Sequence, residues 1–330
     1  MKRIVVLTAV ALAVVVAVTS ASASAPRKDL KNFQHVWVVM MENTSDTSLI
    51  GNANAPYVNH LAQTYGYARN YFGVTHPSQP NYVAITSGST NGVADDHDHT
   101  VSATNIVDQL ESHGKTWRDY QQSLALCNGD KFLSSCGNQL YERKHNPFVS
   151  YTDVASSPAR MANVVDLDQL HGDLWSGNAP DYSFIAPDQC NDMHGRAATP
   201  SDPCDFSNEQ SIISLGDTFL KGLVGDITSS PAWNGNSAIF IVWDESDFTG
   251  STGNFGFGDT SGCCDANPGG GNVLGLVISH SDHSARTSDV AYNHYSALAT
   301  IEDGWKLGCL ANTCDTANVT PMSDLVGPQG

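Results

Sequence analysis

Residues 35–43 form the segment His-Val-Trp-Val-Val-Met-Met-Glu-Asn, in which an apolar run ends in a carboxylate and an amide. The run is continuous rather than alternating, which is typical of a strand buried on both faces of a parallel sheet. Similar runs occupy residues 182–185, 238–243 and 273–278. A helical pattern with apolar residues at intervals of three or four covers residues 212–227. We therefore predict an α/β fold with a central, mostly parallel sheet sandwiched by helices.

Polar side chains follow three of these apolar runs. They are Glu42 and Asn43, Asp244 and Glu245, and Asp192 and His194. A carboxylate after a strand is usually a helix cap or a solvated turn. Three such groups at the carboxyl ends of strands, where ligands of open α/β sheets bind, make that explanation weaker. Oxygen donors with one imidazole suit a divalent cation, so we expect one at this edge.

A possible nucleophile lies in residues 75–82, Thr-His-Pro-Ser-Gln-Pro-Asn-Tyr. Ser78 occupies the expected N-cap of a helix with Pro80 in its first turn. Its hydroxyl would lie beside free N–H groups that can hold phosphate oxygens, although a plain capping serine is the alternative. The chain has no G-x-S-x-G elbow and no glycine-rich nucleotide-binding loop, which argues against an α/β-hydrolase esterase and a nucleotide-binding enzyme. A second helix is expected to begin at Thr104.

The charge balance limits the possible partners. The 330 residues include 16 Lys and Arg against 34 Asp and Glu, for a formal charge of −18. The protein is therefore a poor candidate for binding nucleic acid or an anionic membrane through bulk charge. An anionic substrate would need a local device such as a metal ion or a helix N-terminus. The acidic loop 95–99, Asp-Asp-His-Asp-His, is expected to be solvated.

The first residues have the pattern of an export signal. Lys2 and Arg3 precede the apolar run 4–18, and small residues follow at 21–25. We predict a signal peptide over residues 1–23, cleaved between 23 and 25, and one domain over 26–330. An uncleaved N-terminal anchor is the alternative. No later stretch reaches the roughly 18 apolar residues of a membrane span, so the protein is expected to be secreted without a stable membrane anchor.

All eight cysteines follow the predicted signal peptide, and an even number in an exported protein indicates disulfides. Three short loops are possible, Cys127–Cys136, Cys190–Cys204 and Cys309–Cys314. These would leave the adjacent Cys263 and Cys264 to pair with each other. Sequence alone does not fix this connectivity. A zinc site is the competing interpretation, but no C-x-x-C spacing is present.

Six segments together resemble a known family. They are residues 35–43, 75–82, 141–148, 187–195, 242–245 and 292–303. In this order they resemble the secreted bacterial phosphoesterases that include acid phosphatases and phosphatidylcholine-type phospholipases C. The resemblance implies an alkaline-phosphatase-like fold. The short mature length is most similar to the small secreted acid phosphatases, some of which act on phosphoinositides.

The resemblance also implies roles for individual residues. Glu42, Asn43, Asp244 and Glu245 match metal-site positions, and Ser78 matches the nucleophile. His194 and His145 match active-site histidines. Asp192 lies beside His194, and Asn81 follows the nucleophile closely enough to touch a phosphoryl oxygen, so both are candidates for binding phosphate; the alternative for Asn81 is that it only shapes the turn. His294, at the start of a C-terminal helix, is expected to be structural. Relatives often carry arginine where this chain has Thr44, so a cation that could hold substrate is missing here.

These residues predict hydrolysis of a small-molecule or lipid phosphate monoester through a phosphoserine, with a divalent cation of unknown identity. A phospholipase C that cleaves phosphodiesters is the alternative. A noncatalytic surface-binding protein is a third hypothesis. The intact set of Ser78 and the four metal-site residues argues against it.

Overall fold

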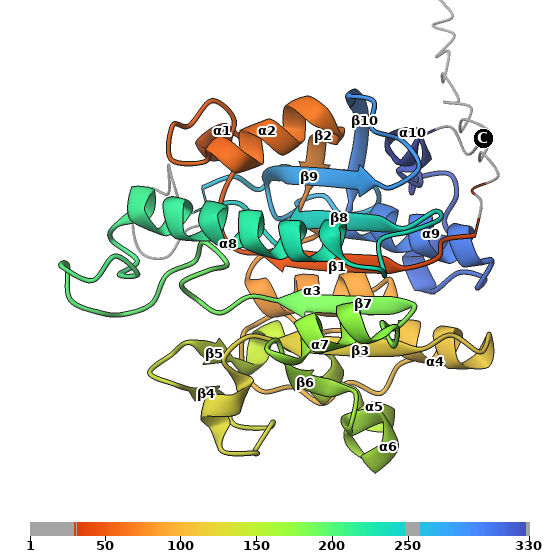
Figure 1. Ribbon diagram of the computed structural model, residues 1–330, viewed down its shortest axis with the longest axis horizontal. Helices are drawn as coiled ribbons and strands as arrows, with labels where there is room; N and C mark the ends of the chain where they lie inside the picture. Colours follow the sequence, from red (N-terminus) through yellow and green to blue (C-terminus); the bar gives the residue numbers. More distant parts are fainter. Residues whose placement is uncertain (1–29, 31, 248–257, 328–330) are drawn as a thin grey trace, which may run out of the picture.

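The computed structural model describes residues 30, 32–247 and 258–327, so the predicted signal peptide lies outside the described residues. An eight-stranded sheet runs through the molecule (Figure 1). In spatial order its strands are β10 (Arg286–Asn293), β2 (Gly66–Phe72), β9 (Asn272–Ser279), β8 (Ala238–Trp243), β1 (Val36–Met41), β7 (Tyr182–Ala186), β3 (Trp117–Gln121) and β6 (Val164–Asp166). The predicted α/β class is confirmed.

The sheet is mostly parallel, as predicted. Strand β9 pairs antiparallel with both of its neighbours, β8 and β2, whereas the other pairs in this sheet are parallel. Every residue of β1, β7 and β8 is buried, which explains why their sequences are continuous apolar runs. The carboxyl ends of β1 and β7 point to the left in Figure 1, and the candidate site lies at this edge.

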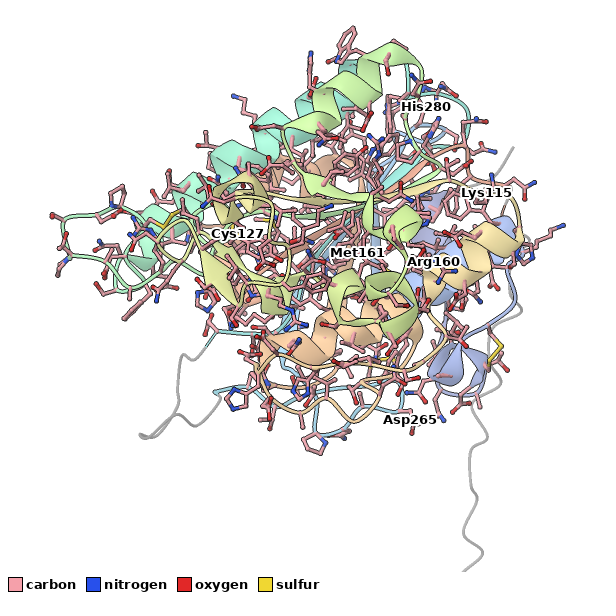
Figure 2. The ribbon with its side chains drawn as sticks, turned by 90° about the horizontal axis from the view of Figure 1, so that it is seen from below. Lys115, Cys127, Arg160, Met161, Asp265 and His280 are labelled. Carbon is pink, nitrogen blue, oxygen red and sulfur yellow. A yellow bond between two sulfur atoms is a disulfide. The ribbon has the colours of Figure 1, made fainter. Side chains whose placement is uncertain are left out.

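Helices cover both faces of the sheet (Figures 1 and 2). Helices α2 (Pro56–Thr64), α7 (Gln169–Ser176) and α8 (Glu209–Ser229) lie on one face. Helices α3 (Ser78–Ser87), α4 (Ile106–Ser112) and α9 (His294–Trp305) lie on the other. Helix α8 carries the predicted apolar face, with Ile212, Leu220 and Ile227 buried. The short helices are α1 (Asp46–Leu49), α5 (Thr152–Ala155), α6 (Pro158–Met161) and α10 (Ser323–Val326).

Two predicted helix starts are shifted by one residue. Ser78 is the first residue of α3, and Pro77, with extended backbone, occupies the N-cap. Helix α4 is capped by Asn105 rather than Thr104, because the Asn105 side chain accepts a hydrogen bond from the N–H of Val107 and forms a capping box with Asp108. Ser78 therefore does not cap its own helix, and its hydroxyl is available for other contacts.

The four disulfides join the cysteines in the pairs that the short loops suggested. The Cys127–Cys136 bridge (Figure 2) ties together a mostly irregular segment that contains the small hairpin β4 (Ser135–Cys136) and β5 (Tyr141–Glu142). The zinc alternative is wrong, because every cysteine is disulfide-bonded. Among the described residues, no helix is both long enough and apolar enough to cross a membrane.

Candidate active site

Strand register brings the first two predicted pairs together. Strands β1 and β8 are adjacent and parallel, with Met41 opposite Trp243, so Glu42 and Asp244 leave the sheet side by side. Strand β7 pairs with β1 on its other side, and the loop after β7 returns to the same edge. There the backbone N–H of Glu42 donates to the carbonyl of Asp192 at 2.8 Å. The loops that follow β1, β7 and β8 therefore meet at one point on the edge of the parallel sheet.

Ser78 meets this carboxylate cluster from helix α3. Its hydroxyl lies 3.1 Å from Glu42 Oε2 and 3.0 Å from Glu245 Oε1, and it can donate to either. The residue is 2% exposed. A serine hydroxyl held by two carboxylates and free of a capping role has the environment of a nucleophile rather than of a structural serine.

Asn43 fixes the other side of the cluster. Its backbone φ of +40° is a conformation that asparagine tolerates better than most residues. The turn directs its N–H to Asp244 Oδ1 at 3.0 Å and its side-chain amide to Glu245 Oε1 at 3.2 Å. Asn43 thereby links the loops that follow β1 and β8.

Several polar atoms here are buried without a hydrogen-bond partner. They are Asn43 Oδ1, Asp192 Oδ2 and Asp244 Oδ2, together with Glu42 Oε1 and His145 Nε2, which lie 3.2 Å from each other but form no hydrogen bond. Unsatisfied buried polar atoms are uncommon in proteins, and a group of oxygens left in this way suits a bound cation. Among the described residues, no group of three or more His, Cys, Asp or Glu side chains is arranged so that it could hold a metal ion. A cation bound here would take the unsatisfied Oδ1 of Asn43 together with the carboxylate oxygens.

The electrostatics of the cluster also favour a cation. Burial, reinforced by the charge of Asp244, raises the pKa of Glu42 well above its usual range. Burial, with a contribution from Glu245, raises the pKa of Asp244 to about 8. Burial likewise raises the pKa of Asp192 far above normal. Several buried carboxyl groups so close together need a positive charge to remain ionised, and the residues present fit a hard divalent ion.

Both predicted histidines line the cluster. His145 lies between two carboxylates, with Nε2 3.2 Å from Glu42 Oε1 and Nδ1 3.6 Å from Asp192 Oδ2. Its ring stacks on Tyr82 with centroids 5.0 Å apart. The ring of His194 is 6.3 Å from that of His145. Its Nδ1 contacts the carbonyl of Gly195 at 2.6 Å, which leaves Nε2 for substrate.

These contacts limit what each group can do. His145 is packed tightly and suits a positioning role. Burial and the nearby charge of Lys144 lower the pKa of His194 to about 4. Asp192 accepts the backbone N–H of His194 at 2.7 Å through Oδ1. Because this hydrogen bond ties Asp192 to the backbone of His194, the geometry favours a role in orienting His194 over direct contact with substrate.

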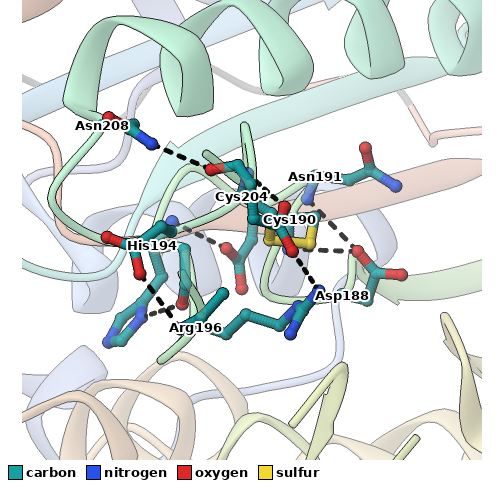
Figure 3. The surroundings of a disulfide bond; sticks show 12 residues. Asp188, Cys190, Asn191, His194, Arg196, Cys204 and Asn208 are labelled. Carbon is teal, nitrogen blue, oxygen red and sulfur yellow. Dashed lines mark hydrogen bonds and ion pairs between the residues drawn. A yellow bond between two sulfur atoms is a disulfide. The ribbon is translucent and has the colours of Figure 1, made fainter. Parts of the chain in front are cut away.

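A disulfide closes the loop that carries these residues (Figure 3). Cys190 and Cys204 are bonded, and the N–H of Arg196 donates to the carbonyl of Cys204 at 2.9 Å. At the other end of the loop, Asp188 Oδ1 accepts the N–H groups of Cys190 and Asn191 at 3.2 Å. A bridge over a loop of this length stabilises a protein by about 3 kcal/mol in the chain-entropy model, so it helps to hold His194 in place.

Asn81 shapes the turn before the nucleophile. Its Oδ1 accepts the N–H groups of Val74 and Thr75 at 2.8 and 3.1 Å. Its Nδ2 donates to the carbonyls of Thr75 and Pro77 at 2.7 and 3.1 Å. The amide is thus fully engaged with backbone, and the geometry favours support of the loop over contact with phosphate.

The first turn of α3 offers phosphate fewer N–H groups than the sequence suggested. Pro80 has none, and the N–H of Gln79 donates to Asp96 Oδ1 at 2.9 Å. Asp96 belongs to the acidic loop that was expected to be merely solvated. Its other oxygen accepts Lys144 Nζ at 2.9 Å. Through Asp96, the acidic loop therefore holds the Lys144 ammonium group near the site.

Sequence reasoning missed two residues of this site, Lys144 and His76. Burial opposes the charge of Lys144, but the carboxylates of Glu42 and Asp96 raise its pKa above the usual value. His76 Nδ1 makes a short contact with Glu245 Oε2, and its Nε2 lies 2.8 Å from the carbonyl of Asp259. Lys144 directly precedes His145, and His76 lies two residues before Ser78. This closeness in sequence was the only signal that could have identified them as site residues.

Thr44 and His294 support the loops of the site. The hydroxyl of Thr44 donates to the carbonyl of Glu42 at 3.0 Å, so this position contributes no cation. His294 is fully buried, with Nε2 2.7 Å from the carbonyl of Asp244 and Nδ1 3.0 Å from the hydroxyl of Tyr71. These contacts agree with the structural role expected for His294.

Curated relatives share low but extensive similarity with the chain. A phosphatidylinositol-3-phosphatase of Mycobacterium tuberculosis is 27% identical over 300 residues, covering 90% of this chain and 84% of that protein. A probable acid phosphatase of Kluyveromyces lactis is 25% identical over 297 residues, covering 87% of this chain but 62% of the relative. An acid phosphatase of Aspergillus fumigatus is 26% identical over 292 residues, covering 87% of this chain and 58% of the relative. The chain thus spans about three fifths of the length of the two fungal relatives.

Solved structures support the fold. An alkaline phosphatase superfamily protein from Vibrio parahaemolyticus superposes with a TM-score of 0.55 at 13% identity, covering 91% of this chain and 71% of that one. A phosphonate monoester hydrolase of Agrobacterium radiobacter superposes with a TM-score of 0.56 at 14% identity, covering 90% of this chain and 78% of that one. The predicted alkaline-phosphatase-like fold is confirmed.

A family profile covers most of the chain. The profile of the Phosphoesterase family matches residues 51–308, a range that includes Ser78, His145, His194, Asp244 and Glu245. With its site residues gathered at one edge of an alkaline-phosphatase-like sheet, the chain belongs to the Phosphoesterase family.

Proposed function

We propose that this protein is a secreted phosphomonoesterase that transfers the phosphoryl group of its substrate to Ser78. The observation that carries the proposal is the Ser78 hydroxyl, which contacts Glu42 and Glu245 in a buried cluster of carboxylates with unsatisfied oxygens. The names of the relatives, acid phosphatases and a phosphatidylinositol-3-phosphatase, support the same reaction class.

Glu42, Asn43, Asp244 and Glu245 would hold a divalent cation. Such an ion would neutralise charge on the phosphoryl oxygens and lower the pKa of the serine hydroxyl. Lys144 adds a positive charge from the chain itself. Positioning and charge neutralisation are the main requirements of phosphoryl transfer, and this donor set supplies both.

In the first step Ser78 Oγ attacks phosphorus, and its proton passes to Glu245, whose carboxylate lies 3.0 Å away. The bond from Oγ to phosphorus forms while the bond from phosphorus to the alcohol oxygen breaks. In acid, where a residue with a pKa of about 4 is partly protonated, His194 gives a proton to the departing oxygen. Water then attacks the phosphoserine and loses a proton to His194, and Glu245 returns the first proton to Ser78.

The place of action is proposed on separate grounds. The predicted signal peptide at residues 1–23 directs export. Four disulfides support an oxidising compartment, because such bonds rarely persist in the cytosol. The substrate would be a small-molecule or lipid phosphate ester, and phosphoinositides are among the candidates.

The test measures phosphate release from an aryl phosphomonoester and alcohol release from a choline phosphodiester by the purified mature protein. We expect the monoester to be cleaved faster, and activity to fall with chelator and to disappear in Ser78→Ala. Preference for the diester would favour a phospholipase C instead. Activity that survives in Ser78→Ala would contradict the proposed nucleophile.

A further inference from the structure

A cavity of about 430 Å³ opens beside the candidate nucleophile. Asn43 and His194 line it, and both also belong to the site around Ser78. A phosphoryl group at Ser78 would therefore have its alcohol portion next to this space. The volume is in the range of pockets that bind small organic molecules, which is more than a phosphate alone requires.

The floor and mouth of the cavity are apolar. Met193 and Ile212 are buried in its wall, at 4% and 2% exposure. Phe206 also lines it and is 61% exposed. Such an aromatic side chain at the mouth of a pocket can contact an apolar substituent of a ligand.

The charged side chains around the cavity are acidic. Glu209, the first residue of α8, and Asp247 both line it. No lysine or arginine is among its described lining residues, and position 44 contributes a threonine. Figure 3 shows His194 below the start of α8, where Asn208 precedes Glu209. A helix N-terminus by itself attracts anions, and the carboxylate of Glu209 opposes that effect here.

From these features we infer that the cavity binds the alcohol portion of the substrate and selects esters whose alcohol is apolar and either neutral or cationic. Esters with a second anionic group on the alcohol are disfavoured, and these include phosphoinositides, whose alcohol carries a phosphodiester. The inference rests on the proposed phosphomonoesterase function and specifies its substrate class. The cation Lys144, held by Asp96, does not line this cavity.

Three substrates of equal chain length test the inference. They are n-hexyl phosphate, 6-aminohexyl phosphate and hexane-1,6-diyl bisphosphate, which end in a neutral, a cationic and an anionic group. If the exposed Glu209 and the half-buried Asp247 each contribute about a threefold effect, kcat/KM for the first two should exceed that for the bisphosphate by about tenfold. Equal or faster cleavage of the bisphosphate would overturn the inference.

Variants of the lining residues test whether the cavity causes the selectivity against anionic alcohols. Glu209→Gln should narrow the ratio between n-hexyl phosphate and the bisphosphate by about threefold, and Glu209→Lys should narrow it further. Asp289→Asn removes an exposed carboxylate on the edge strand β10 and should leave the ratio unchanged. A ratio that is the same in Glu209→Lys as in the unmodified protein would contradict the assignment. Phe206→Ser should raise KM for n-hexyl phosphate more than for methyl phosphate.

Calorimetry separates this inference from the proposed function. Binding of n-hexylphosphonate and hexane-1,6-diyl bisphosphonate, which cannot be hydrolysed, reports on the cavity without turnover. We expect tighter binding of n-hexylphosphonate. If that order is found but no ester is cleaved, the proposed function fails and the cavity assignment stands. Equal affinities, or tighter binding of the bisphosphonate, would overturn the assignment even in an active enzyme.

Discussion

Replacing Asn81 by alanine should destabilise the protein before any substrate binds. The side chain is completely buried and makes four hydrogen bonds to the backbone of residues 74–77. Alanine would leave the N–H groups of Val74 and Thr75 without their acceptor. At about 1–3 kcal/mol for each buried unsatisfied group, the loss is about 2–6 kcal/mol. That is a large part of the stability of an ordinary domain, which is about 5–15 kcal/mol.

Urea unfolding of the substrate-free protein measures this loss. Asn234→Ala is the matched control, because Asn234 is exposed and donates to the carbonyl of Pro231 in a surface turn. Its expected effect is within about 0.5 kcal/mol. If Asn81→Ala left the free energy of unfolding within about 1 kcal/mol of the unmodified value and raised KM strongly, the reasoning would be refuted. Asn81 would then be a substrate contact, the other role that its position close to Ser78 in the sequence suggested.

Three further predictions concern Lys144, the metal site and a buried carboxyl group. Lys144→Met should lower kcat/KM for a phosphomonoester by about 10²-fold or more, because a cation at this position would stabilise the negative charge that develops in the transition state. Lys144→Arg should recover part of the activity. Steady-state kinetics measures both effects, and a wild-type kcat/KM in Lys144→Met would contradict the prediction. Adding a divalent cation at 100 times its dissociation constant to protein stripped of metal by a chelator should stabilise the fold by about 2.7 kcal/mol, measured by thermal unfolding. Asp244→Asn should abolish this stabilisation. An equal rise of the unfolding temperature in the variant would place the ion elsewhere. Burial raises the pKa of Glu302 to about 7, so its protonated form stabilises the fold at acid pH, and about 3 kcal/mol should be lost as pH rises from about 4.5 to 7. Urea unfolding at pH 5 and pH 8 should show this loss, and Glu302→Gln should remove it; the same pH dependence in both proteins would contradict the assignment.

The buried strands could be predicted because their chemistry is local. A strand covered on both faces needs apolar residues throughout, and β1, β7 and β8 have them. Strands β2, β3, β6 and β10 were not predicted. The half-exposed sequences of β2 and β10, Gly-Tyr-Ala-Arg-Asn-Tyr-Phe and Arg-Thr-Ser-Asp-Val-Ala-Tyr-Asn, carry polar residues, and β3 and β6 are short and contain charged residues. The direction of β9 could not be predicted, since an apolar run looks the same in either orientation.

The site was predictable where residues follow buried strands. Glu42 and Asp244 come directly after β1 and β8, and the parallel register brings them together. Contacts across long loops left no such pattern. The pairing of Lys144 with Asp96 joins residues 48 apart in sequence, and the contact of His76 with Glu245 joins residues 169 apart. The engagement of the Asn81 amide with backbone depends on the conformation of the loop, which composition does not specify.

The central claim is that Ser78 carries the phosphoryl group during turnover. The most direct measurement is mass spectrometry of the purified protein, quenched in acid within the first turnovers on a phosphomonoester and then digested. We predict that the peptide containing Ser78 gains the mass of one phosphoryl group, that Asp244→Asn accumulates less of it, and that Ser78→Ala shows none. Hydrolysis of the ester with no phosphoryl group on Ser78 at any quench time would contradict the account.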